Sequence, residues 1–176
     1  MFRGVRGWLE NRRLARLPVT RAQWESAVSV WPVAARYQDS DRDRLFDLTR
    51  RFLVRKEFAA GGDFVLGDDR QLLIATMAVV PVFGLGLDWY DGWYTVIVYE
   101  DTFVTPDGEV DEFGIVHDEG RVLAGEAWLQ GPVILSWRDV AEPTRLRRIS
   151  YAVFCVKKQK DHSAVRLPVC RPHTPG

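Results

Sequence analysis

The apolar positions in the first half of the chain recur at the three- and four-residue spacing of helices. One run, opened by Thr20 and Gln23 at the spacing of a capping box, predicts a short amphipathic helix. A second capping spacing, Ser40 with Asp43, predicts a longer helix that ends at Gly61-Gly62. The apolar positions of this longer helix are Leu45, Phe46, Leu48, Phe52 and Leu53. Each of these helices is expected to bury one face.

A third helix, predicted from about Arg70 to Val80, is apolar nearly all round. Because a helix without a polar face is buried on several sides, this one is expected at the centre of the domain. Between the second and third helices, Phe64-Val65-Leu66 is a strand candidate.

From Leu87 onward the apolar residues recur with a period of two, which is typical of strands. Four runs are predicted strands: residues 95–99, 103–104, 113–117 and 133–137. Helices first and strands afterwards favour an α+β class, with N-terminal helices followed by a small mixed or antiparallel sheet, over a βαβ alternation.

The segment Gly125-Glu126-Ala127-Trp128 precedes the last of these runs, and Gly131-Pro132 marks the join. This pattern predicts a loop delivered onto a strand. Two tryptophans and one carboxylate so close together indicate either a packed corner, which we favour, or the rim of a binding cleft.

The charge of the chain is divided unevenly, although its formal net charge is zero. Residues 144–176 hold eight of the 24 basic residues and one of the 24 acidic residues, so this tail carries +7 and the remaining residues carry −7. Both cysteines and two of the three histidines also lie in the tail. We therefore predict a basic N-terminal arm (1–19), an ordered domain (20–143) and an atypical basic tail (144–176).

The cellular compartment is predicted from the signals for export and membrane insertion. No signal-peptide core and no apolar run of about 20 residues is present, so a cytoplasmic protein without membrane contact is expected. A nucleic-acid site in the basic tail is the least favoured interpretation, because basic residues alone are not specific.

Few residue patterns point directly to chemistry. There is no Gly-rich phosphate loop, no Gly-x-Ser-x-Gly and no Cys-x-x-Cys. The tail contains four residues of the types that bind zinc, namely Cys155, His162, Cys170 and His173. Their spacing matches no common zinc finger, so we interpret them as a coincidence of composition.

The chain resembles the Mlc titration factor A (MtfA) family of zinc-dependent peptidases. The resemblance is carried by the segments Gly125-Glu126-Ala127-Trp128, Gly131-Pro132-Val133, Leu135-Ser136-Trp137, Lys56-Glu57-Phe58, Leu85-Gly86-Leu87-Asp88-Trp89-Tyr90 and Val96-Ile97-Val98-Tyr99, and it covers about residues 20 to 142. It implies a gluzincin-like domain, zinc as cofactor, peptide substrates, and a sugar-responsive transcriptional repressor, Mlc, as partner.

The departure from the family lies just after these segments. In the family, a helix with His-Glu-x-x-His follows, in which both histidines bind zinc and the glutamate activates water. This sequence contains no His-Glu pair, and Thr144 to Ile149 stand where that helix is expected. The resemblance therefore predicts no catalytic residues and no bound zinc for the chain as written.

Two hypotheses follow from this departure. The first is that the residues from about Thr144 onward arise from a frameshift or a miscalled reading frame, which leaves a peptidase-like protein without its active centre. The alternative is a non-catalytic protein that sequesters a transcriptional repressor, using its acidic body to meet a basic surface.

The resemblance also implies where a substrate would lie. In gluzincin-like peptidases an edge strand near the zinc helix receives the substrate backbone by β-pairing. The run from Val133 to Trp137 is expected to be that strand. The predicted cleft residues are Glu126, Trp128, Val133, Leu135 and Trp137.

Overall fold

The computed structural model describes residues 2–105, 109–110, 116–117, 121–127, 131–141 and 165–168. Its helices are α1 (Phe2–Leu14), α2 (Arg21–Val28), α3 (Asp39–Arg55), α4 (Asp68–Val79) and α5 (Trp137–Ala141), with short 3-10 turns at Ala34–Arg36, Val80–Val82 and Leu87–Tyr90. Its strands are β1 (Glu57–Ala60), β2 (Thr95–Tyr99), β3 (Phe103–Thr105), β4 (Glu109–Val110), β5 (Val116–His117), β6 (Arg121–Ala127), β7 (Val133–Ser136) and β8 (Val165–Pro168).

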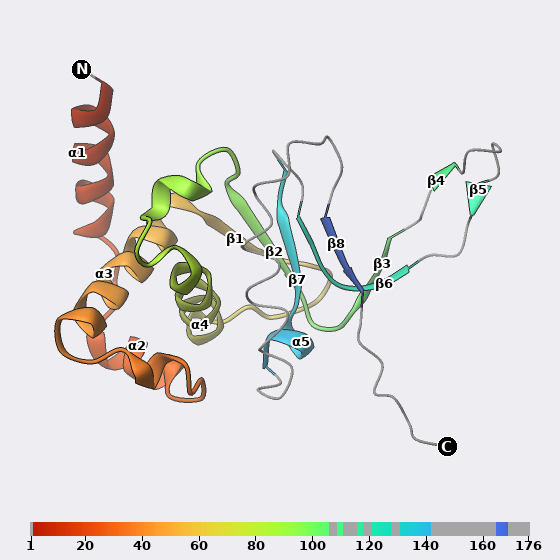
Figure 1. Cartoon of the computed structure of the whole chain (residues 1–176), viewed down its shortest axis with the longest axis horizontal. Helices are drawn as coiled ribbons and strands as arrows, with labels where there is room; N and C mark the ends of the chain where they lie inside the picture. The colour runs from red at the N-terminus through yellow and green to blue at the C-terminus, as the bar shows by residue number, and fades with distance from the viewer. Residues whose placement is uncertain are drawn as a thin grey trace.

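The main sheet has the strand order β1-β2-β7-β6-β3, and β8 also pairs with β6. The strands β1, β2 and β7 run parallel, whereas β6 is antiparallel to β7, β3 and β8. The helices α1 to α4 gather at one side of this sheet, and the small β4–β5 hairpin projects from the other (Figure 1). The predicted α+β class with a small mixed sheet is confirmed.

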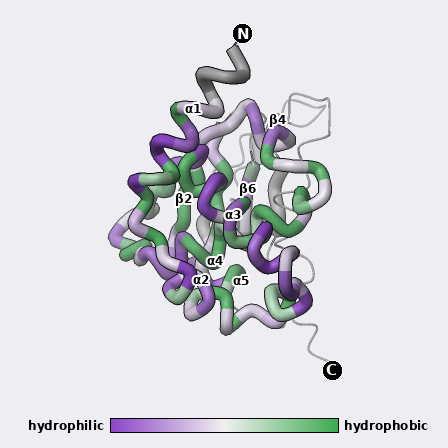
Figure 2. The backbone as a smooth tube through the Cα atoms, turned by 90° about the vertical axis from the view of Figure 1, so that its left-hand side faces the viewer, coloured by the Kyte–Doolittle hydropathy of each residue, from purple (hydrophilic) through white to green (hydrophobic). Residues whose placement is uncertain are grey.

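The helix α4 is the centre of the core, as its apolar sequence predicts. All eight residues from Leu72 to Val79 are buried. The helices α2 and α3 pack against α4, and its apolar side chains join those of Val96 and Val98 from β2 in one core cluster. In Figure 2 the tube at β2 is largely hydrophobic, whereas hydrophilic and hydrophobic stretches alternate at α2, which agrees with an interior formed by α4 and the sheet.

The helix starts are only partly predicted by the sequence. The capping box of α2 is confirmed, because Thr20 and Gln23 bond each other's backbone N–H groups. The capping box predicted at Ser40 and Asp43 is wrong, because α3 begins at Asp39 and no side-chain hydrogen bond caps it in the described structure. Instead, the carboxylates of Asp39 and Asp41 in its first turn interact favourably with the positive end of the helix dipole.

The arm predicted at residues 1–19 contains α1, which packs against α3. Glu10 is buried, and its carboxylate accepts hydrogen bonds from Arg51 Nη1 (3.1 Å) and Arg55 Nε (3.0 Å). Arg50 Nη2 also donates to the carbonyl of Leu14 at 2.8 Å. These contacts attach α1 to the domain.

The structure contains a βαβ unit that the sequence pattern did not predict. The helix α3 ends at Arg55 rather than at Gly61, and β1 then pairs in parallel with β2 across α4. The backbone is extended at Lys56, and its ammonium donates to the carbonyls of Tyr90 (2.7 Å) and Trp93. The predicted strand at residues 64–66 is not formed.

No helix in the described parts of the chain combines the length and the apolar character needed to cross a membrane.

Candidate functional site

The segment that the sequence singled out, residues 125–137, forms an antiparallel strand pair rather than a loop and a strand. Gly125, Glu126 and Ala127 belong to β6, where they pair with Leu135, Ile134 and Val133 of β7. The expectation of a loop at this position is wrong, because cross-strand pairing extends β6 through the glycine.

The expectation that Val133 to Trp137 forms an edge strand is also wrong. The strand β7 pairs with β2 on one side and with β6 on the other. At residues 125–127, β6 is in turn covered by β8 on its second side. Since both edges of β7 are used within the sheet, its backbone has no edge left for a peptide.

The predicted cleft residues are distributed over opposite faces of the sheet. Val133 and Leu135 lie in register with Val96 and Val98, and all four are buried in the core cluster. Glu126 is the cross-strand partner of Ile134, so it lies on the other face, where it is only 1% exposed. The side chains of Val133 and Leu135 therefore cannot line the same surface as Glu126.

Trp137 lies at the end of β7, where the chain turns into α5. The hydroxyl of Ser136 accepts a hydrogen bond from the backbone N–H of Asp139 at 3.4 Å, the arrangement of an N-cap. The guanidinium of Arg70 lies over the Trp137 ring, 5.0 Å from its centre. Trp128 lies outside the described residues, so the assignment of these residues to a substrate cleft stays a prediction.

The described residues do not offer a donor set for zinc. No group of three or more histidine, cysteine, aspartate or glutamate side chains that could hold a metal ion occurs among them. A catalytic zinc site needs three protein ligands and a structural site needs four. The weak candidates Cys155, His162, Cys170 and His173 lie outside the described residues.

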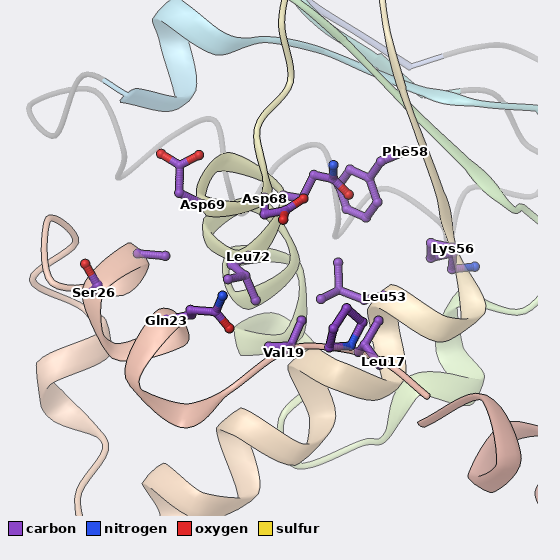
Figure 3. Close-up of a pocket in the computed structure, with 13 residues that line it drawn as sticks. Leu17, Val19, Gln23, Ser26, Leu53, Lys56, Phe58, Asp68, Asp69 and Leu72 are labelled. Atoms are coloured by element: carbon purple, nitrogen blue, oxygen red, sulfur yellow. The ribbon is translucent and has the colours of Figure 1, made fainter. Parts of the chain in front are cut away.

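A second candidate site is a hollow of about 460 Å³ on the helical side of the molecule (Figure 3). Its apolar walls include Leu17, Val19, Leu53, Phe58 and Leu72. The polar residues around it include Gln23, Ser26, Asp68, Asp69 and Gln71. The hollow was not predicted, because its lining residues come from three separate stretches of the chain, 17–27, 53–58 and 68–72, and no single stretch marks it.

Comparison with known proteins identifies the family. The family described as glucose-regulated metallo-peptidase M90 matches residues 5–155, which includes most of α1 and continues past Pro143.

Individual relatives agree with this match. The chain is 35% identical to Mlc titration factor A of Cronobacter sakazakii over 135 residues, which is 77% of this chain and 49% of that protein. It is 36% identical over 119 residues to the protein of the same name from Escherichia fergusonii, covering 68% of this chain and 44% of the relative. The chain thus spans about half the length of the curated relatives it matches. It belongs to the glucose-regulated metallo-peptidase M90 family.

Proposed function

We propose that this chain carries the scaffold of a zinc-dependent peptidase but, as written, not its catalytic centre. Family membership supports peptide hydrolysis as the reaction of the family. The absence of a catalytic centre is inferred from the sequence, which contains no His-Glu pair. In the family, zinc would polarise the scissile carbonyl and lower the pKa of a bound water. The donors in the described residues do not fit that ion.

A peptidase assay tests the proposal. The purified chain would be incubated with zinc and a set of chromogenic aminoacyl and peptidyl anilides, with Mlc titration factor A of Cronobacter sakazakii as the positive control. No hydrolysis above the buffer rate is expected. Hydrolysis that a chelator abolishes and zinc restores would contradict the proposal.

The origin of the tail is a separate part of this proposal. We propose that residues from about Thr144 onward derive from a shifted reading frame, because charge, cysteine and histidine content all change at that point. The family match, which runs to residue 155, weighs against a shift as early as Thr144. Translating the other frames of the gene beyond Pro143 tests this. A His-Glu-x-x-His segment in one of them is expected, and its absence from all of them would refute the frameshift.

A second function is favoured by the name of the relatives and by charge. The relatives are called titration factors of Mlc, and residues 1–143 carry a net charge of −7 that suits a basic partner surface. In this alternative the chain sequesters an Mlc-like repressor in the cytoplasm without cleaving it. A pull-down with purified repressor in the presence of a chelator would detect such binding, and no retention of the repressor would count against it.

A further inference from the structure

The strand β1 forms one end of the main sheet, and its outer edge has no strand partner among the residues that the structure describes. Its bonds to β2 fix the direction of its main-chain groups. The N–H groups of Glu57 and Gly61 donate to the carbonyls of Tyr94 and Val98, both at 2.8 Å. Because these groups alternate along a strand, those of Phe58 and Ala60 point away from β2.

The outward groups of β1 are accessible. The described structure supplies no backbone partner for the N–H or the carbonyl of Phe58 or Ala60. Glu57, Ala59 and Ala60 are exposed, and Phe58 is half-buried. An exposed strand edge of this kind is a template for pairing with another polypeptide.

The hollow described above lies beside this edge. The side chain of Phe58 forms part of its wall, opposite Leu53 and Leu72 (Figure 3). The two carboxylates at its rim, Asp68 and Asp69, are exposed, and neither takes part in the ion pairs between described residues. Lys56 also lines the hollow, but its ammonium donates to the carbonyls of Tyr90 and Trp93. A ligand of this site should therefore combine an apolar group with a positive charge.

Strand geometry connects the edge with the hollow. In a strand added to β1, the residue opposite Phe58 has its side chain on the same face of the sheet as the Phe58 ring. That is the face on which the hollow lies. The residues before and after it point to the opposite face, so one apolar side chain is selected at this position.

We propose that β1 and the adjacent hollow bind an extended segment of a partner protein, which adds a strand to the sheet. One apolar side chain of the segment enters the hollow beside Phe58, and a lysine or arginine lies near Asp68 and Asp69. This goes beyond the function proposed above, because β1 is separated from β6 by β2 and β7 and the binding needs no zinc. A second copy of this chain fits poorly, since its own β1 carries Glu57 and no basic residue.

The proposal can be tested with a synthetic probe, acetyl-Thr-Arg-Val-Leu-Val-Lys-Thr-amide, and the full chain. Two versions of the probe would be N-methylated on alternate amides, so that each loses the donors of one edge only. One version should bind about tenfold more weakly than the unmodified probe, the loss expected for about one main-chain hydrogen bond, and the other should bind equally well. Hydrogen exchange at Phe58 and Ala60, but not at Glu57, should slow on binding.

Protein variants provide the second arm. Ala60→Pro removes an outward N–H at a position where an edge strand tolerates proline, and should weaken probe binding about tenfold. Asp68→Asn combined with Asp69→Asn should weaken binding of the basic probe but not binding of an analogue in which glutamine replaces its arginine and lysine. The control variant Asp63→Asn, at another exposed aspartate, should change the binding of neither probe.

Three results would overturn the proposal: equal binding of both methylated probes, no binding of any probe, or a dimer in sedimentation that Ala60→Pro dissociates. The last would assign the edge to a second copy of the chain. None of them bears on zinc content, so failure here is distinguishable from failure of the proposed function.

Discussion

At the scale of single residues, the buried hydroxyl of Thr76 accepts a hydrogen bond from the indole N–H of Trp24. Trp24 Nε1 donates to Thr76 Oγ1 at 2.9 Å, and this oxygen donates to the carbonyl of Leu72 at 2.7 Å. Thr76→Val leaves the indole N–H unpaired in the core, so we expect the free energy of unfolding to fall by about 1–3 kcal/mol in urea denaturation. Thr49→Val is the comparison variant: Thr49 Oγ1 donates to the carbonyl of Leu45 and lies 3.3 Å from Thr76 Oγ1, and its removal leaves the bond between Trp24 and Thr76 in place. Equal losses in the two variants would contradict this role of Thr76.

A second residue-scale prediction concerns Glu25, which joins α2 to α3. Its carboxylate accepts hydrogen bonds from Arg42 Nε and Arg21 Nε, each at 2.9 Å. The bond from Arg42, more than any other contact, lowers the pKa of this carboxyl below its ordinary value of 4.5. The unfolded chain lacks this shift, so the stabilisation is complete above pH 4.5 and is lost as the pH falls through the folded pKa.

Glu25→Gln should therefore be less stable than the original chain at pH 7, by an amount that shrinks towards pH 3. Urea denaturation at both pH values measures the difference. An equal difference at the two pH values would show that the ionised carboxylate is not the source of the stabilisation.

At the scale of elements, the end of β1 depends on close approach to β2. A Cβ atom at Gly61 would lie 2.5 Å from the Tyr99 ring, whereas one at Gly84 would meet nothing within 4 Å. Gly61→Ala must displace the ring or the strand, and we expect a loss of about 1–3 kcal/mol in the free energy of unfolding. Thermal denaturation should show a lower Tm for Gly61→Ala than for the control Gly84→Ala. If the two variants melt together, the close approach of β1 to Tyr99 is refuted.

The elements that the sequence predicts correctly are those with strong local patterns. The cap at Thr20 and the apolar run of α4 depend on neighbouring residues only, and both are confirmed. The strand β1 was missed because its formation depends on the distant carbonyls of Tyr94 and Val98. Likewise, Gly125 suggests a turn locally, but pairing with Leu135 holds it in β6. Strand pairing is non-local, so the period of a short segment does not reveal it.

At the scale of the whole molecule, family membership was predictable but the arrangement of the site was not. The segments between Lys56 and Trp137 indicate the family, and the family match covers residues 5–155. These segments do not reveal the strand order of the sheet. In that order β7 lies inside the sheet, Val133 faces the core and Glu126 faces the opposite side. The hollow beside Phe58 was equally hidden, since its walls meet only after folding.

The central claim, that this chain has the fold of a metallo-peptidase family without its metal centre, depends on the absence of a zinc donor set. Elemental analysis of the purified 176-residue chain, dialysed first against zinc and then against zinc-free buffer, tests it most directly. We predict that no tightly bound zinc remains, because the sequence lacks His-Glu-x-x-His and the described residues hold no cluster of three ligands. One zinc ion retained per chain would contradict the claim and would direct attention to Cys155, His162, Cys170 and His173.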